Sequence, residues 1–232
     1  FDELGIKKKH RIDTKSSILF FANMFRYVQH IMQFEEIELY QKPNSQSRLR
    51  LYCGHLPALV VGEKHSVFKD VLQKRLYFEI ARQLTFAKVE CQLFRTIQTS
   101  DISALLQAAL DLYKITTEKF GTADEKNLLK WQKRLKKINK EDEKLKLAKL
   151  LQKWWNTEEE HDLNRYEQAV TFTANRMGLI LANDFETIKD GIIDGWSVVG
   201  EFSPKEQFED LARFALSEDF TIIRREIGMM IV

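Results

Sequence analysis

The chain has 232 residues, of which 44% are hydrophobic and 30% charged, so it can bury one large core and has the composition of a globular protein. Its net charge of +2 provides no overall field for nucleic acid, and Cys53 and Cys91 are not the pattern of a disulfide framework. The nine glycines and three prolines disfavour an all-β fold with many tight turns.

The first third of the chain predicts a helix and three strands. After a cap at Asp13 or Thr14, apolar residues at helical spacing predict a helix that continues to about residue 31. Alternating apolar residues at 37–39 and 49–51 predict two strands joined by a loop through Pro43. The continuous apolar run 58–61 predicts a third strand, which we expect to be central or well covered and to end at Gly62.

The remaining two thirds predict helices. Their expected ranges are 68–89, 102–113, 122–138, 144–155, 163–182, 185–198 and 204–216, the last starting with Pro204 at its first position. The sequence has no repeat of fixed period and no low-complexity linker. We therefore expect a mainly helical α+β fold in one domain spanning 1–232, with about three strands in an antiparallel or mixed sheet and seven or more helices.

The sequence also predicts where the protein is located in the cell. The most apolar N-terminal stretch, 18–32, is interrupted by Arg26 and His30 and is too short to span a bilayer. No signal peptide is visible, so we expect a cytoplasmic protein. Because the chain begins at Phe1 rather than Met, we expect it to be a fragment of a longer protein.

Three segments carry a resemblance to a known family: LPALVVG at 56–62, LYFEIARQL at 76–84 and TFTANRMG at 171–178. Their order, after an initial helix and strands, is similar to that of HtpX-like zinc metallopeptidases of the gluzincin type, over roughly residues 18–190. In that family a strand leads into a helix bearing HExxH, and a later helix bears ExxADRxG, whose Glu is the third zinc ligand. A similar degenerate domain is attached to bacterial tetratricopeptide-repeat proteins, which fits the start at Phe1. The resemblance therefore implies a zincin-like fold.

The reactive residues of that family are replaced at every position of the two motifs. In the first motif, Arg82 and Phe86 stand in place of the two His ligands, and Gln83 stands in place of the general base. In the second motif, Thr171 stands in place of the third ligand and Asn175 in place of the Asp. We call these the five aligned positions. Arginine does not ligate zinc, glutamine is no general base and phenylalanine has no donor atom.

The resemblance thus implies a catalytically inactive module that holds no metal or cofactor and acts as a protein-interaction or scaffold domain. A partner peptide would add to the edge of the sheet, a mode that needs backbone groups rather than catalytic ones. Arg82 either pairs with a carboxylate such as Glu79 or Glu167, or lies on the surface.

Other motifs leave two alternatives open. The chain has no G-x-S-x-G, no P-loop and no G-x-G-x-x-G, so a hydrolase would need an unrecognised site. Cys53 and His55 lie two residues apart, but no second pair with metal-ligand spacing follows, so we interpret them as a buried thiol and a loop imidazole. His161, beside an acidic run, is expected in a solvated turn.

The second alternative rests on the lysine-rich region 126–153, which is interleaved with leucine and tryptophan. It predicts either two helices with a solvated lysine face, or a basic helical module that binds nucleic acid, an anionic membrane or an acidic partner. Adjacent residues point about 100° apart on a helix, so we expect one of its paired tryptophans to be exposed as a contact anchor. The candidate contact residues are Lys133, Arg134, Lys136, Lys137, Trp154 and Trp155.

Overall fold

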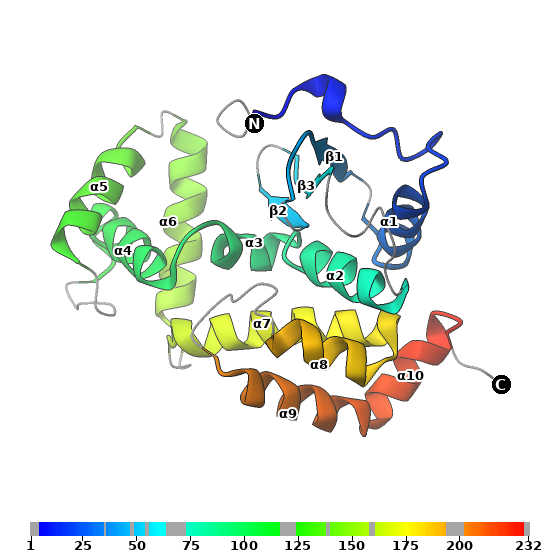
Figure 1. The fold of residues 1–232 in the computed structure, drawn as a ribbon. Coiled ribbons are helices and arrows are strands. Elements are labelled where there is room, and N and C mark those ends of the chain that lie inside the picture. The colour runs from blue at the N-terminus through cyan, green and yellow to red at the C-terminus, as the bar shows by residue number, and fades with distance from the viewer. Residues whose placement is uncertain are drawn as a thin grey trace. The chain divides into compact units, whose positions relative to one another are not determined.

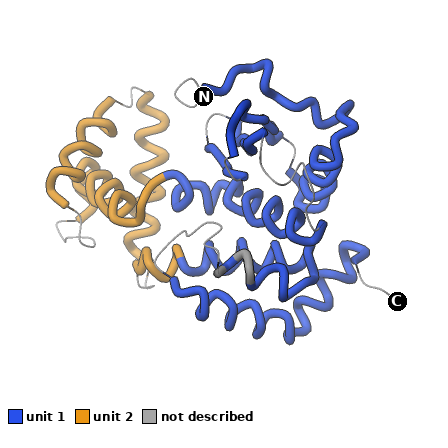
Figure 2. The backbone as a smooth tube through the Cα atoms, viewed as in Figure 1, with its two compact units in different colours: residues 1–96, 168–232 blue, residues 97–167 orange. Residues whose placement is uncertain are grey.

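The structure is a computed structural model that describes residues 5–34, 36–46, 49–53, 56–63, 73–116, 124–137, 140–157, 161–193 and 202–229. These residues form ten α-helices, a short 3-10 helix at Lys8–His10 and three strands, as the mainly helical α+β prediction requires (Figure 1). The chain divides into two compact units, residues 1–96 with 168–232 and residues 97–167 (Figure 2).

The sheet of the first unit is mixed. Its strands are β1 (Glu38–Lys42), β2 (Arg50–Tyr52) and β3 (Ala58–Gly62), in the order β1-β3-β2. β3 pairs parallel with β1 and antiparallel with β2, and all five of its residues are buried. The prediction of a central third strand is therefore confirmed. The loop-connected strands β1 and β2 do not pair with each other, because the continuously apolar β3 lies between them.

Both edges of this sheet have additional hydrogen-bond partners. At the β1 edge, Arg11 forms an antiparallel bridge with Tyr40, and the Ile12 N–H donates to the Leu39 carbonyl at 2.8 Å. At the β2 edge, the Leu51 N–H donates to the side chain of Gln83 at 3.1 Å. A peptide that adds as a strand at either edge therefore has to displace one of these bonds.

The helices of the first unit agree in part with the sequence pattern. They are α1 (Phe20–Ile31), α2 (Gln73–Thr85), α3 (Val89–Thr96), α7 (Leu163–Ala182), α8 (Phe185–Ile193), α9 (Pro204–Ala215) and α10 (Glu218–Glu226). α7 has its predicted bounds, and α9 begins at Pro204 behind a capping box formed by Ser203 and Glu206. α10 was not predicted. α2 ends sooner than the pattern suggests, and α3 begins as a separate helix.

The predicted cap of the first helix is wrong. The Asp13 side chain accepts from the Lys15 N–H at 3.0 Å and from the Ser16 hydroxyl at 2.7 Å, which closes a local turn. α1 begins later, at Phe20, with Leu19 as its N-cap. Asp and Ser compete with the helix by bonding to nearby backbone groups, which explains the delayed start.

A close contact between α2 and α7 organises the helical part of this unit. Phe78 of α2 shares a buried cluster with Leu179 and Ala182 of α7, Ile188 and Ile192 of α8, and Leu211 of α9. At Gly178 a Cβ atom would come closest to Cδ2 of Phe78, and would lie 2.6 Å from its Cε2 and 3.1 Å from its Cγ. Only glycine permits this approach of the two helices, which run in opposite directions (Figure 1).

The second unit is a helical bundle of α4 (Thr99–Leu112), α5 (Glu125–Leu135), α6 (Glu141–Trp155) and the first turn of α7. α4 packs against α5. The buried residues of its core are Ala108, Ala109, Leu110, Leu135 and Leu151. Thr122, which the sequence suggested as a helix cap, lies outside the described residues, and the observed N-cap of α5 is Asp124.

Candidate functional site

All five aligned positions are buried. Arg82 is 3% exposed and Gln83 is 4% exposed, while Phe86, Thr171 and Asn175 are fully inaccessible. Arg82 and Gln83 lie in the last turns of α2, Phe86 directly follows this helix, and Thr171 and Asn175 lie on α7. The interpretation of Arg82 as a surface residue is therefore wrong.

The helix contact at Gly178 brings the aligned positions at the end of α2 close to those on α7. One helical turn after Phe78 leads to Arg82, and one turn before Gly178 leads to Ala174, next to Asn175. Because α2 and α7 run in opposite directions and touch at Phe78 and Gly178, these turns occupy the same stretch of the helix pair (Figure 1).

Arg82 places a cation in this stretch. Burial, followed by repulsion from Arg95, lowers the pKa of Arg82 to about 10, and the nearby Glu79 carboxylate acts in the opposite direction. Glu79 also accepts a hydrogen bond from Arg75 at 3.3 Å, whereas Glu167, the other expected partner, accepts one from the Thr99 hydroxyl. With a pKa of about 10, Arg82 is charged at neutral pH, and this charge opposes the binding of a divalent metal ion.

Gln83 fastens α2 to the sheet. Its Oε1 accepts the buried hydrogen bond from the Leu51 N–H. At this one of the five aligned positions, the side chain thus acts as a structural acceptor for an edge strand. The sequence could not reveal this bond, because the two residues lie 32 positions apart.

Replacement of Gln83 by leucine is expected to lower the free energy of unfolding by about 1–3 kcal/mol, because the buried Leu51 N–H then has no acceptor. Urea denaturation followed by circular dichroism measures this change. The exposed Gln152→Leu substitution is the matched control, with an expected effect below about 0.5 kcal/mol. Equal stabilities of the two variants would show that the bond to β2 contributes nothing.

The ANRMG segment of α7 attaches this helix to its neighbours. Asn175 donates through Nδ2 to Oε1 of Gln207 at 3.1 Å, and Gln207 donates through Nε2 to the Phe202 carbonyl at 3.1 Å. The Asn175 Oδ1 atom is buried and has no hydrogen-bond partner among the described residues. Asn175 therefore links α7 to α9.

Arg176 makes a second link to α9. Its Nε donates to Oδ2 of Asp210 at 2.9 Å, and its Nη2 donates to the other carboxylate oxygen. This forked ion pair raises the pKa of Arg176. Sequence reasoning missed Gln207 and Asp210, although a polar pair at i, i+3 on an otherwise apolar helix face was a possible signal.

The four-cation surface, Lys133, Arg134, Lys136 and Lys137, is exposed at the C-terminal end of α5. Here the Arg134 Cζ lies 4.9 Å from the Trp131 ring centre, and the Lys130 Nζ lies 5.6 Å from it. The four cations therefore form the predicted solvated face, and Arg134 among them lies over the Trp131 ring.

The expectation of an exposed tryptophan is wrong. Trp154 and Trp155 are both half-buried, and both pack against the core cluster of the second unit. His161 lies between them rather than in a solvated turn, with its ring centre 4.3 Å from Trp154 and 5.3 Å from Trp155. Both adjacent rings therefore pack against one core cluster, and the imidazole contacts each of them.

Replacement of Trp154 by alanine is expected to destabilise the second unit by about 2–4 kcal/mol, since a large ring leaves the cluster. Neutralising the four-cation surface with glutamine is expected to change stability by less than about 0.5 kcal/mol. Urea unfolding followed by circular dichroism compares the two variants. A stable Trp154→Ala protein would restore the interpretation of this residue as a contact anchor.

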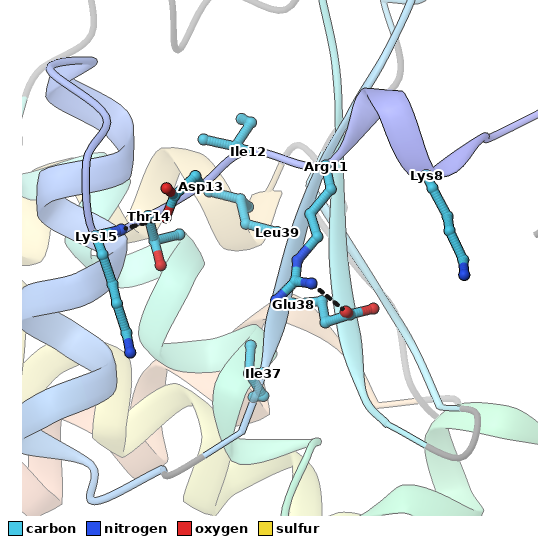
Figure 3. Close-up of a pocket in the computed structure, with 9 residues that line it drawn as sticks. All are labelled: Lys8, Arg11, Ile12, Asp13, Thr14, Lys15, Ile37, Glu38 and Leu39. Atoms are coloured by element: carbon cyan, nitrogen blue, oxygen red, sulfur yellow. Dashed lines mark hydrogen bonds and ion pairs between the residues drawn. The ribbon is translucent and has the colours of Figure 1, made fainter.

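A pocket of about 490 Å³ lies between the N-terminal segment and β1 (Figure 3). Its lining residues are Lys8, Arg11, Ile12, Asp13, Thr14, Lys15, Ile37, Glu38 and Leu39. The Arg11 guanidinium pairs with the Glu38 carboxylate at 3.2 Å, and the Tyr40 hydroxyl donates to this carboxylate at 2.8 Å. None of the five aligned positions lines this pocket.

No helix in the described ranges is long and apolar enough to cross a lipid bilayer. Within the same ranges, no group of three or more His, Cys, Asp or Glu side chains is placed to hold a metal ion. His55 and His65 lie outside the described residues. Comparisons of the chain with family models, curated proteins and solved structures found no match.

Proposed function

We propose that this chain is a catalytically inactive, zincin-like module that works by binding a protein partner. The observation that supports this proposal most is the buried guanidinium of Arg82, one turn from the contact between Phe78 and Gly178. This is the position at which the resembled peptidases have their first zinc ligand. A buried cation in its place opposes the binding of Zn²⁺ and offers no lone pair to it.

The distribution of retained and replaced residues supports the same proposal. Residues of the second motif that hold helices together keep a clear role, since Gly178 permits the close approach to Phe78 and Arg176 pairs with Asp210. By contrast, the five aligned positions, where the resembled peptidases have their reactive residues, hold a cation, two amides, an apolar ring and a hydroxyl group. This distribution supports a module that keeps the helix packing without the peptidase reaction, and binding is a function that such a module can perform.

Two assays test this proposal. Fluorogenic peptides and unfolded casein, incubated with the chain and with added Zn²⁺, are expected to remain intact. A protein partner, isolated by cross-linking and then purified, is expected to bind in a complex that persists to about 0.5 M salt, because it does not depend on phosphate contacts. Chelator-sensitive peptide cleavage would contradict the proposal.

The exposed four-cation surface favours a second candidate, a basic module for nucleic acid. That function requires an affinity for duplex DNA or RNA that falls steeply with salt and falls again when Lys133, Arg134, Lys136 and Lys137 are neutralised. Fluorescence anisotropy with a labelled duplex at several salt concentrations distinguishes the candidates. Binding that is lost in the neutralised variant would favour the basic module over the protein-binding one.

A further inference from the structure

The pocket between residues 8–15 and β1 has walls that hydrogen bonds fix at both ends (Figure 3). At one end the Ile12 N–H donates to the Leu39 carbonyl at 2.8 Å, where the segment pairs with β1. At the other end Nη1 of Arg26, on α1, donates to the carbonyls of Thr14 and Lys15 at 3.1 and 3.0 Å. The pocket is therefore preformed, and its volume of about 490 Å³ is typical of sites for small molecules.

The two carboxylates at this pocket already have partners within the protein. Glu38 accepts from the Arg11 guanidinium through Oε1 at 3.2 Å and from the Tyr40 hydroxyl through Oε2 at 2.8 Å. Both oxygens of Asp13 accept hydrogen bonds within its own turn. Every carboxylate oxygen at the pocket thus has a donor, and a cationic ligand would have to displace one of them.

The polar groups that remain for a ligand are donors. Lys8 and Lys15 line the pocket on either side of Arg11 (Figure 3). Among the described residues, neither of these ammonium groups forms an ion pair or a hydrogen bond, and the hydroxyl of the half-buried Thr14 has no hydrogen-bond partner either. The pocket therefore offers positive charge and hydrogen-bond donors to a molecule that enters it.

We propose that this pocket binds a small organic molecule that carries a carboxylate or phosphoryl group. Oxyanions of both kinds accept charge-assisted hydrogen bonds from ammonium groups, which Lys8 and Lys15 supply here. The aliphatic residues Ile12, Ile37 and Leu39 complete the lining and provide contacts for an apolar body of the ligand. This site goes beyond the proposed function and does not depend on it, since none of the five aligned positions contributes to it.

Amide NMR with three related aromatic compounds tests the site. The chain is titrated at constant ionic strength with phenyl phosphate, with benzoate and with benzamide, the neutral analogue of benzoate. At least one of the two anions is expected to cause saturable ¹H–¹⁵N shifts at Ile12, Thr14 and Leu39. Tighter binding of phenyl phosphate indicates a phosphoryl ligand, and tighter binding of benzoate indicates a carboxylate. Equal binding of benzamide, or no saturable shift at these residues, would overturn the proposal.

Lysine substitutions assign the binding to the pocket. Lys8→Gln and Lys15→Gln change exposed side chains, so folding is not at risk. Each is expected to weaken the binding of the tighter anion about threefold to tenfold, the usual effect of losing one hydrogen bond. Lys9→Gln removes the same charge from an exposed position that does not line the pocket, and is expected to leave binding unchanged. Equal weakening by all three would show that only general charge attracts the anion, and would overturn the site.

Thr14→Val provides a test that does not alter the charge. It removes the hydroxyl, keeps the branched shape of the side chain and is expected to weaken the binding of the tighter anion about twofold to fivefold. Circular dichroism confirms that the variant is folded. Unchanged binding in this variant and in both lining-lysine variants would place the anion outside the pocket, which would contradict the proposal.

Discussion

Zinc binding is expected to appear when four aligned positions receive the residues of the resembled peptidase motifs. The substitutions are Arg82→His, Gln83→Glu, Phe86→His and Thr171→Glu. The two imidazoles would lie at i, i+4 at the end of α2, and the new carboxylate would lie on α7, the helix that touches α2 at Gly178. Elemental mass spectrometry of the purified variant is expected to find about one zinc per chain.

Two incomplete variants serve as controls for this experiment. The first keeps Phe86 and carries the other three substitutions, and the second keeps Thr171. Each lacks one ligand and is expected to bind zinc much more weakly, since a tetrahedral site needs three protein ligands and a water. Circular dichroism must show that all variants are folded. A folded four-fold variant without zinc, or one that binds no better than its controls, would contradict the zincin-like alignment of α2 and α7.

The second large effect is expected at Gly178. Gly→Ala substitution in a helix usually stabilises a protein by up to about 1 kcal/mol. Here the added Cβ would meet the Phe78 ring, 2.6 Å from its Cε2, and would force the two helices apart. We therefore expect Gly178→Ala to destabilise the chain by about 1–3 kcal/mol, as overpacked cores do. Urea unfolding followed by circular dichroism measures both the size and the sign.

A double-mutant cycle identifies the ring as the cause. Phe78→Leu alone removes buried contacts and is expected to destabilise the protein. In combination with Gly178→Ala it makes room for the new methyl group, so the two losses are expected to sum to more than the loss measured in the double variant. Strict additivity, or stabilisation by Gly178→Ala alone, would show that α2 and α7 do not touch at this point.

Local sequence patterns predicted the elements better than their contacts. Period and capping were sufficient for the three strands, for the bounds of α7 and for the start of α9, since each depends on neighbouring residues. The pairing of β3 with both β1 and β2 depends on residues far apart in the chain, as does the bond between Leu51 and Gln83. Nothing in a local window specifies such partners.

The candidate site illustrates the same limit. The sequence pattern left Arg82 either on the surface or in an ion pair, because a single arginine on an apolar helix fits both. Its burial and its neighbour Arg95 depend on where α3 lies relative to α2, which local periodicity does not encode. The expectation of an exposed tryptophan failed for a similar reason. The rings of Trp154 and Trp155 both contact His161, which follows them beyond the end of α6.

The metal content of the unaltered chain tests the central claim most directly. The protein is purified without chelator and without a polyhistidine tag, and its zinc is quantified by elemental mass spectrometry. A chain with a buried cation at the first ligand position is expected to contain no stoichiometric metal. About one zinc per chain would contradict the inactive-module account and would direct the search for ligands to Cys53, His55 and His65.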